Sequence, residues 1–308
     1  MKKSYLYGPV PSRRLGLSLG VDIIPFKVCS LDCVYCQLGL TTKKTIQPQE
    51  YFSEQEILKQ IKKKIESSSR IDYITFSGSG EPTLNSQIGS LITKIKKITN
   101  IPVAVLTNST LLTKKNVRDA LKKADLVVPS LDGATQEVFE KINRPHASLK
   151  IEDIIEGLKK FRKEFKGNLW LEVILVKGMN DSEDHLKALK KTIHEIKPDK
   201  VQLNTVIRPP SEKFAKPLSK KKMERIRGFL GSKSEIVAHF HKKGLTPEEE
   251  NLRDIILDMI RRRPVTVDDI SDSLGRHKNE VLKYIDMLKR ENKIKPVSYE
   301  NKDYYEPT

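Results

Sequence analysis

Residues 19–37 read LGVDIIPFKVCSLDCVYCQ, a short apolar run followed at once by a loop with three cysteines. The run is rich in Val and Ile and predicts a β-strand over 19–25. The loop holds Cys29, Cys33 and Cys36, which are all the cysteines of the 308-residue chain. Three cysteines cannot all pair as disulfides, and partners this close would enclose only very short loops. The pattern therefore predicts a metal site directly after a strand.

Five similar apolar runs follow the first and alternate with helical patterns. They lie at 72–78, 102–108, 125–131, 169–177 and 200–207. Strands that alternate with helices are typical of parallel βαβ units. We therefore predict an α/β fold for residues 1–240, in the form of a partial (β/α)6 barrel like that of triosephosphate isomerase (TIM).

The pattern changes near residue 246. Thr246 is placed to cap a helix, and two further helical segments follow, one from Thr266 through Leu274 and one around Ile285. The last residues alternate enough to form two strands around ENKD at 300–303. Three helices and a hairpin predict a small winged helix-turn-helix domain over residues 246–308.

The composition indicates a protein that does not enter a membrane. Charged residues make up 31% of the chain, and its longest apolar runs are far too short for a membrane span. The start, MKKSYLYGPVPSRR, lacks the apolar core and cleavage site of a secretory signal. We expect a soluble, cytoplasmic protein, in which cysteines stay reduced and can bind iron.

The net charge of +17 is unevenly distributed. Residues 246–308 carry a net charge of −2, from 12 Lys and Arg against 14 Asp and Glu, so the excess lies in the predicted barrel. The stretch 213–243 alone has 10 Lys and Arg against 2 acidic residues. Such a surface attracts polyanions such as RNA. Solvated lysines with no binding role account for the same composition equally well.

Polar motifs stand where the predicted strands end. SGSGEP (77–82) ends the second strand, TNST (107–110) the third and SLDG (130–133) the fourth. The carboxyl ends of parallel barrel strands open at one mouth, so these motifs and the cysteine loop are expected to meet there.

Individual residues near this mouth suggest binding roles. Gly78 and Gly80 let the backbone approach a ligand closely, and Glu81 would favour a nearby cation. Glu172 would contact substrate or cofactor if it points into the barrel, and Arg208 follows the last predicted strand.

The spacing CxxxCxxC, with Tyr35 before the last cysteine and GEP after the next strand, resembles the radical S-adenosylmethionine (SAM) superfamily over about residues 5–240. The resemblance implies that Cys29, Cys33 and Cys36 bind three irons of one [4Fe-4S] cluster and that SAM chelates the fourth. An electron from a flavodoxin- or ferredoxin-type donor would then cleave SAM to methionine and a 5′-deoxyadenosyl radical, which abstracts hydrogen from a substrate.

The resemblance also implies a set of SAM-binding residues: Tyr35, Gly78, Ser79, Gly80, Glu81, Asn108 and Ser130. SGSGEP is similar to the GGEP element that binds the SAM ammonium group, with Ser79 in place of the commonest glycine. The backbone of Tyr35 is expected at the adenine, and Asn108 and Ser130 at the ribose or carboxylate. Asn108 and Asp132 have an alternative role as caps of the helices that follow them.

The segments YGPVPSRRLGLSLGVDIIP and VQLNTVIRPP, with the cysteine loop, resemble a poorly characterised branch of iron-sulfur oxidoreductases. This branch is related to the wyosine-forming tRNA enzymes and, more distantly, to MoaA-type synthases. Those relatives use a second cluster, and no cysteine remains here to bind one. We expect a one-cluster enzyme acting on RNA in preference to peptide, with the winged helix docking substrate or partner. The alternative is an iron-sulfur or SAM-sensing regulator that binds DNA without turnover.

Overall fold

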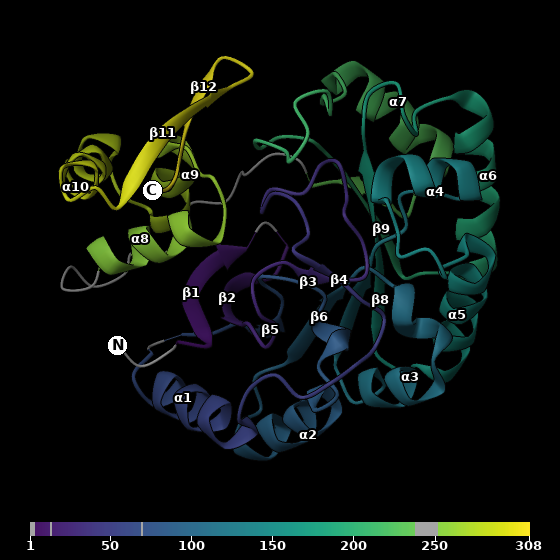
Figure 1. The fold of residues 1–308 in the computed structure, drawn as a ribbon, viewed down its shortest axis with the longest axis horizontal. Helices are drawn as coiled ribbons and strands as arrows, with labels where there is room; N and C mark the ends of the chain where they lie inside the picture. The colour runs from purple at the N-terminus through teal and green to yellow at the C-terminus, as the bar shows by residue number, and fades with distance from the viewer. Residues whose placement is uncertain (1–3, 13, 69, 238–251) are drawn as a thin grey trace.

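Six of the eight strands in the main sheet are those that the sequence predicts. The computed structural model describes residues 4–12, 14–68, 70–237 and 252–308. The strand order is β1-β2-β5-β6-β7-β8-β9-β10, and from β2 onward all neighbours are parallel (Figure 1). The strands are β1 (Leu6–Ser12), β2 (Gly16–Val21), β5 (Tyr73–Phe76), β6 (Val103–Thr107), β7 (Leu126–Pro129), β8 (Asn168–Leu175), β9 (Lys200–Thr205) and β10 (Ser234–Ile236).

Both edge strands are additions to the predicted set. β1 pairs with β2 in antiparallel fashion and contains Pro9 and Pro11, although proline is uncommon within strands. Proline is tolerated here because β1 has a neighbour on one side only. β10 has only three residues, too few for a periodic pattern. The result is a mainly parallel α/β sheet, consistent with the predicted partial barrel.

Helices cover the outer face of the curved sheet (Figure 1). Their apolar faces pack against strand residues that are fully buried, such as Ile74, Phe76 and Val105. Several helices begin at a capping serine; for example, Ser53 accepts a hydrogen bond from the backbone N–H of Glu56. The helices are α1 (Glu54–Glu66), α2 (Ile88–Ile98), α3 (Lys115–Leu121), α4 (Gln136–Asn143), α5 (Ile151–Glu164), α6 (Glu183–Ile196) and α7 (Lys220–Leu230).

The cysteine loop lies between β2 and α1, inside the curve of the sheet (Figure 1). It is held by a short parallel pair, β3 (Val28–Cys29) and β4 (Lys43–Lys44). Two 3₁₀ turns, Pro82–Leu84 and Thr110–Thr113, follow β5 and β6.

The C-terminal residues form a separate unit with an apolar core of its own. The unit consists of α8 (Leu252–Arg262), α9 (Val267–Leu274), α10 (Lys278–Arg290), β11 (Ile294–Tyr299) and β12 (Lys302–Pro307). β11 and β12 pair as an antiparallel hairpin. The predicted cap at Thr246 and the predicted domain boundary lie outside the described residues. The elements match the predicted order, and the winged-helix assignment stays a prediction.

The C-terminal unit packs beside β1 and reaches the segment after β9 (Figure 1). The hydroxyl of Tyr304 donates to the carbonyl of Ile207 at 2.5 Å, and Lys216 Nζ lies 3.0 Å from Glu300 Oε1. The unit therefore adds side chains to the mouth of the barrel. Among the described residues, every helix is too short or too polar to cross a bilayer.

Candidate active site

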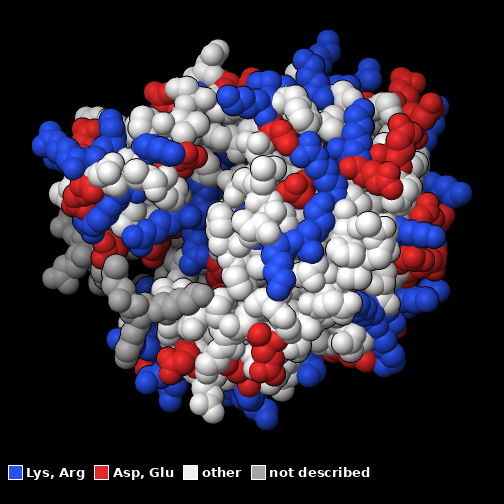
Figure 2. Space-filling model, in the orientation of Figure 1, with Lys and Arg blue, Asp and Glu red and all other residues white. Residues whose placement is uncertain are grey.

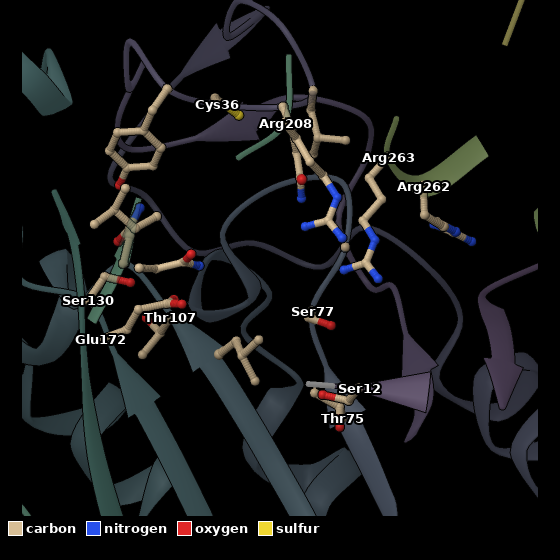
Figure 3. Close-up of a pocket in the computed structure, with 18 of the residues that line it drawn as sticks. Ser12, Cys36, Thr75, Ser77, Thr107, Ser130, Glu172, Arg208, Arg262 and Arg263 are labelled. Atoms are coloured by element: carbon tan, nitrogen blue, oxygen red, sulfur yellow. The ribbon is translucent and has the colours of Figure 1, made fainter. Parts of the chain in front are cut away.

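A cavity of about 410 Å³ lies at the carboxyl ends of the strands (Figure 3). The cysteine loop, the ends of β5 to β9 and the C-terminal unit all line it. Most of the predicted site residues reach it, namely Cys29, Tyr35, Cys36, Gly78, Gly80, Glu81, Asn108 and Ser130. Cys33 and Ser79 are held in the same loops but do not line the cavity. The convergence predicted from the strand ends is therefore observed.

Each cysteine sulfur accepts a hydrogen bond from a nitrogen donor. The pairs are Lys27 Nζ to Cys36 Sγ (3.1 Å), Asn108 Nδ2 to Cys29 Sγ (3.4 Å) and Asn143 Nδ2 to Cys33 Sγ (3.3 Å). Burial raises the pKa of the Cys29 thiol to about 12, and it raises the pKa of Cys33 as well. The charge of Cys36 adds to the shift at Cys29, and the charges of Cys29 and Cys36 add to the shift at Cys33. Such thiols bind as thiolates only when a metal supplies compensating charge.

The three cysteines are soft sulfur donors. Within the described parts of the chain, no three His, Cys, Asp or Glu side chains are already arranged to hold a single metal ion. The soft donor set of three cysteines also favours iron and sulfide over a hard cation.

Glu81 joins the loops after β5 and β6. Its buried carboxylate accepts hydrogen bonds from Thr83 N (3.0 Å), Thr83 Oγ1 (2.6 Å), Thr107 Oγ1 (2.6 Å) and Asn108 N (2.7 Å). Burial raises the pKa of Glu81, while these four donors oppose the shift. The carboxylate thus fixes Asn108, which in turn donates to Cys29 and to Ser30 Oγ.

The two glycines before Glu81 are required by close packing within the protein. A Cβ on Gly80 would lie 2.0 Å from Val28 O, and one on Gly78 would lie 2.5 Å from the Asp22 carboxylate carbon. Gly78 also has a φ of 147°. Ser79 Oγ donates to Asp22 at 2.6 Å, so the serine that replaces the commonest glycine has an internal partner.

The fourth strand-end motif supplies a residue that sequence reasoning treated only as a possible cap. Asp132 is buried and accepts hydrogen bonds from Tyr35 Oη, from Asn143 Nδ2 (2.8 Å) and from Ile174 N (2.8 Å). Burial raises the pKa of Asp132 to about 6. These hydrogen bonds connect Tyr35, which precedes Cys36, to the ends of β7 and β8.

Asn143 is a site residue that the sequence analysis missed. It opens the segment NRPH (143–146), and its amide contacts both Cys33 and Asp132. Helix α4 ends at Asn143, and the side chain of this residue reaches the cysteine loop. His146, in the same segment, pairs locally through Nδ1 with Ser148 Oγ at 2.9 Å.

Glu172 points into the barrel, where it lines the cavity (Figure 3). Its carboxylate forms an ion pair of 2.6 Å with Arg14, whose side chain is 10% exposed. Arg14 also donates to Gln202 Oε1 at 3.0 Å. Arg14 comes from the turn between β1 and β2, so the extra edge strand delivers a cation to the site.

The C-terminal unit contributes two more arginines that sequence reasoning did not place here. Arg262 and Arg263 line the cavity together with Arg208 (Figure 3). Arg262 forms an ion pair with Asp22 and lies 4.5 Å from the centre of the Tyr7 ring. Arg262 is 240 residues from its partner, so no local pattern could reveal the contact.

Comparison with known proteins agrees with this geometry. The radical SAM superfamily matches residues 23–189. UPF0026 protein MJ1312 of Methanocaldococcus jannaschii is 36% identical over 97% of this chain and 94% of its own length. A protein named GTPase Obg of Brachyspira hyodysenteriae is 38% identical over 96% of this chain, which spans only 44% of that protein. A GTP 3′,8-cyclase of Thermodesulfovibrio yellowstonii, a MoaA-like homologue, is 29% identical over 55% of this chain and 52% of its own length.

Solved structures share the fold at low identity. A radical SAM methyltransferase from Sphaerobacter thermophilus has a TM-score of 0.52 and 18% identity, covering 71% of this chain and 66% of that one. SuiB of Streptococcus suis, solved with SAM bound, has a TM-score of 0.51 and 17% identity, covering 70% of this chain and 49% of that one. The family match spans the three cysteines, the GEP motif and the strands that carry them, and the chain therefore belongs to the radical SAM superfamily of enzymes.

Proposed function

We propose that the cavity holds one [4Fe-4S] cluster on Cys29, Cys33 and Cys36, with one iron left for SAM. The observation that carries this proposal is the convergence of a three-cysteine loop and the GEP turn on one cavity. When bound, the reduced cluster would supply the electron that cleaves SAM to methionine and a 5′-deoxyadenosyl radical.

The chain's own residues orient and tune this centre. N–H groups of Lys27, Asn108 and Asn143 point at the three sulfurs. Hydrogen bonds to cluster sulfurs offset negative charge and so favour the reduced state. These donors are neutral amides in two cases and an ammonium in the third, so Lys27 has the largest expected effect on reduction potential.

The SAM-binding residues are proposed to be Tyr35, Gly78, Ser79, Gly80, Glu81, Asn108 and Ser130. Two features support this set: backbone edges near Gly78 and Gly80 line the cavity, and Glu81 locks the loops after β5 and β6 together. Glu81 acts as a positioning residue in this proposal, because its oxygens are already occupied by protein donors.

The substrate is proposed to be RNA or an RNA-like nucleotide in preference to a peptide. The barrel part of the chain carries the positive charge, and Figure 2 shows Lys and Arg side chains spread over the face that includes the junction with the C-terminal unit. The name of the GTP 3′,8-cyclase relative also specifies a nucleotide substrate. The motifs YGPVPSRR and VQLNTVIRPP support a relation to the wyosine-forming tRNA enzymes.

Residues 246–308 are proposed to be a winged-helix domain that docks substrate or partner, beside a core of residues 1–240. Cations at the start of α10 are already neutralised: Lys278 lies 2.8 Å from Asp268, and Arg276 lies 3.4 Å from Glu280. This pairing gives less support to the alternative, a DNA-binding regulator. The electron donor is proposed to be of the flavodoxin or ferredoxin type.

Anaerobic reconstitution tests the proposed function. The reconstituted protein, given dithionite and SAM, is expected to release 5′-deoxyadenosine, and a Cys36→Ala variant is expected to release none. Cluster assembly without cleavage, together with salt-sensitive binding to a promoter fragment, would favour the regulator instead.

A further inference from the structure

The turn of residues 77–81, which leads into the GEP motif, is held by a buried carboxylate. Asp22 comes directly after β2, and its side chain is only 9% exposed. It accepts hydrogen bonds from Ser79 N at 3.2 Å and from Ser79 Oγ at 2.6 Å. Gly78 leaves the space that Asp22 occupies, because a Cβ on Gly78 would lie 2.5 Å from the carboxylate carbon. The path of the turn therefore depends on the position of Asp22.

The cation that pairs with Asp22 comes from the C-terminal unit, whose helix α8 lies beside β1 (Figure 1). Arg262 Nη1 forms an ion pair with Asp22 Oδ2, the same oxygen that accepts Ser79 Oγ. The guanidinium also lies 4.5 Å from the centre of the Tyr7 ring, and the hydroxyls of Tyr7 and Ser77 are hydrogen-bonded at 2.6 Å. Arg262 thus contacts two side chains that hold the turn, one at Ser77 and one at Ser79.

The turn is bonded in its own right to the cysteine loop. Lys27 N donates to Ser79 O at 2.6 Å, and Glu81 N donates to Val28 O at 3.2 Å. These bonds join the turn to the two residues that precede Cys29. A continuous series of contacts therefore runs from α8 through Asp22 and the turn to the start of the cysteine loop.

A turn with two glycines needs such support, because glycine loses more conformational freedom on ordering than other residues do. Among the described residues, the ion pairs of Asp22 are limited to the one with Arg262. Removal of one partner from a buried pair leaves an uncompensated charge, which then moves toward water or takes up a proton. Either change at Asp22 would weaken the hydrogen bonds to Ser79. Arg262 is therefore placed to fix the backbone of the turn.

We propose that Arg262 is a positioning residue of the SAM site, which holds the turn 77–81 in its SAM-binding conformation through Asp22 and Tyr7. The inference rests on the proposed function for the identity of the ligand. It goes beyond docking of a substrate or partner, because it makes the C-terminal unit part of the SAM site even when no substrate is bound. A partner that drew this unit away from β1 would lower the affinity for SAM.

Amide hydrogen exchange on the full-length, cluster-free protein tests the positioning role without cluster or SAM. Arg262→Gln is expected to raise the exchange rate of the amides in 77–81 by about 10-fold, because Asp22 loses its cation and holds Ser79 N less firmly. Exchange in the buried strand β6 should not change. Arg261→Gln is the matched control, because Arg261 is the neighbouring residue on α8, is 56% exposed and lies outside the cavity lining. It should exchange as the parent does.

Equilibrium binding of SAM to the reconstituted protein, with no substrate present, tests the consequence for the ligand. Arg262→Gln should weaken SAM binding by about 10-fold, which corresponds to about 1.4 kcal/mol, with iron and sulfide content unchanged. Arg262→Lys keeps the cation and should lie between the parent and Arg262→Gln. Asp22→Asn removes the other charge of the pair. Combined with Arg262→Gln, it should weaken SAM binding no more than the worse single variant does, because both residues act through one contact.

The possible outcomes separate this role from others. The proposal is overturned if the amides of 77–81 exchange in Arg262→Gln as in the parent, if their exchange rises while SAM affinity is unchanged, or if the losses of the two single variants add. Faster exchange throughout the barrel would assign Arg262 a general structural role and would overturn it as well. A parent protein that assembles a cluster but binds no SAM would instead overturn the proposed function, and hydrogen exchange would still decide whether Arg262 holds the turn.

Discussion

Replacing Glu81 by glutamine tests whether one buried carboxylate holds the site together. Glu81→Gln keeps the size of the side chain and replaces one oxygen with an NH₂ group. The remaining oxygen can still serve the three donors on Thr83 and Thr107, now found at 2.6 to 3.0 Å from Oε1. The NH₂ group would then face the backbone N–H of Asn108, now 2.7 Å from Oε2.

The expected loss of folding stability follows from the backbone N–H of Asn108, which would no longer have an acceptor. A hydrogen bond to a charged group contributes about 1.5–3 kcal/mol, and a buried N–H left without an acceptor adds to the cost. Burial raises the pKa of Glu81, so neutralising the carboxylate recovers part of its desolvation cost. The net destabilisation should be about 2 kcal/mol, or a few degrees in the unfolding midpoint.

Urea unfolding and the visible spectrum of the reconstituted protein measure the two consequences. Glu81→Gln should unfold at lower urea and bind SAM more weakly, because Asn108 is no longer fixed beside Cys29. Glu137→Gln, on the exposed face of α4, is the control and should match the parent. Unchanged stability together with unchanged SAM affinity in Glu81→Gln would refute the positioning role.

Three other results are expected from the same structure. Gly80→Ala should prevent stable folding or cost several kcal/mol, because its Cβ would lie 2.0 Å from a backbone oxygen. Gly228→Ala, which has open space around it in α7, should instead raise stability by about 0.5–1 kcal/mol. Urea unfolding measures both changes. Tyr304→Phe should cost about 1 kcal/mol and increase proteolysis of the C-terminal unit, since its hydroxyl bonds the barrel. Burial lowers the pKa of His185, so protonation of this residue favours the unfolded chain. The contribution of His185 to stability should be fully present above the unfolded pKa of about 6.5 and be lost as pH falls below it. His185→Gln should weaken this pH dependence, and an unchanged pH profile would contradict the assignment.

The sequence predicts the parallel strands well because each is a short buried run of apolar residues with helices on either side. It also predicts that the cysteine loop, Glu81 and Asn108 meet, since strand ends share one mouth. It does not predict β1, because this strand contains two prolines, and proline is uncommon in strands except at the edge of a sheet.

The sequence fails to predict two of the site residues for a different reason. Asn143 reaches Cys33 over 110 positions, and Arg262 reaches Asp22 over 240. Contacts of this kind depend on how whole elements pack. No local pattern in the chain marks either residue as part of the site.

The most direct test of the central claim is anaerobic electron paramagnetic resonance on the reconstituted protein, with and without SAM. About four irons and four sulfides per chain are expected, with a reduced cubane signal that shifts when SAM is added, because SAM would bind the iron that lacks a cysteine. Two results would contradict the claim that SAM completes a three-cysteine cluster. The first is a cluster that assembles but whose signal does not change with saturating SAM. The second is a protein that retains zinc and no sulfide.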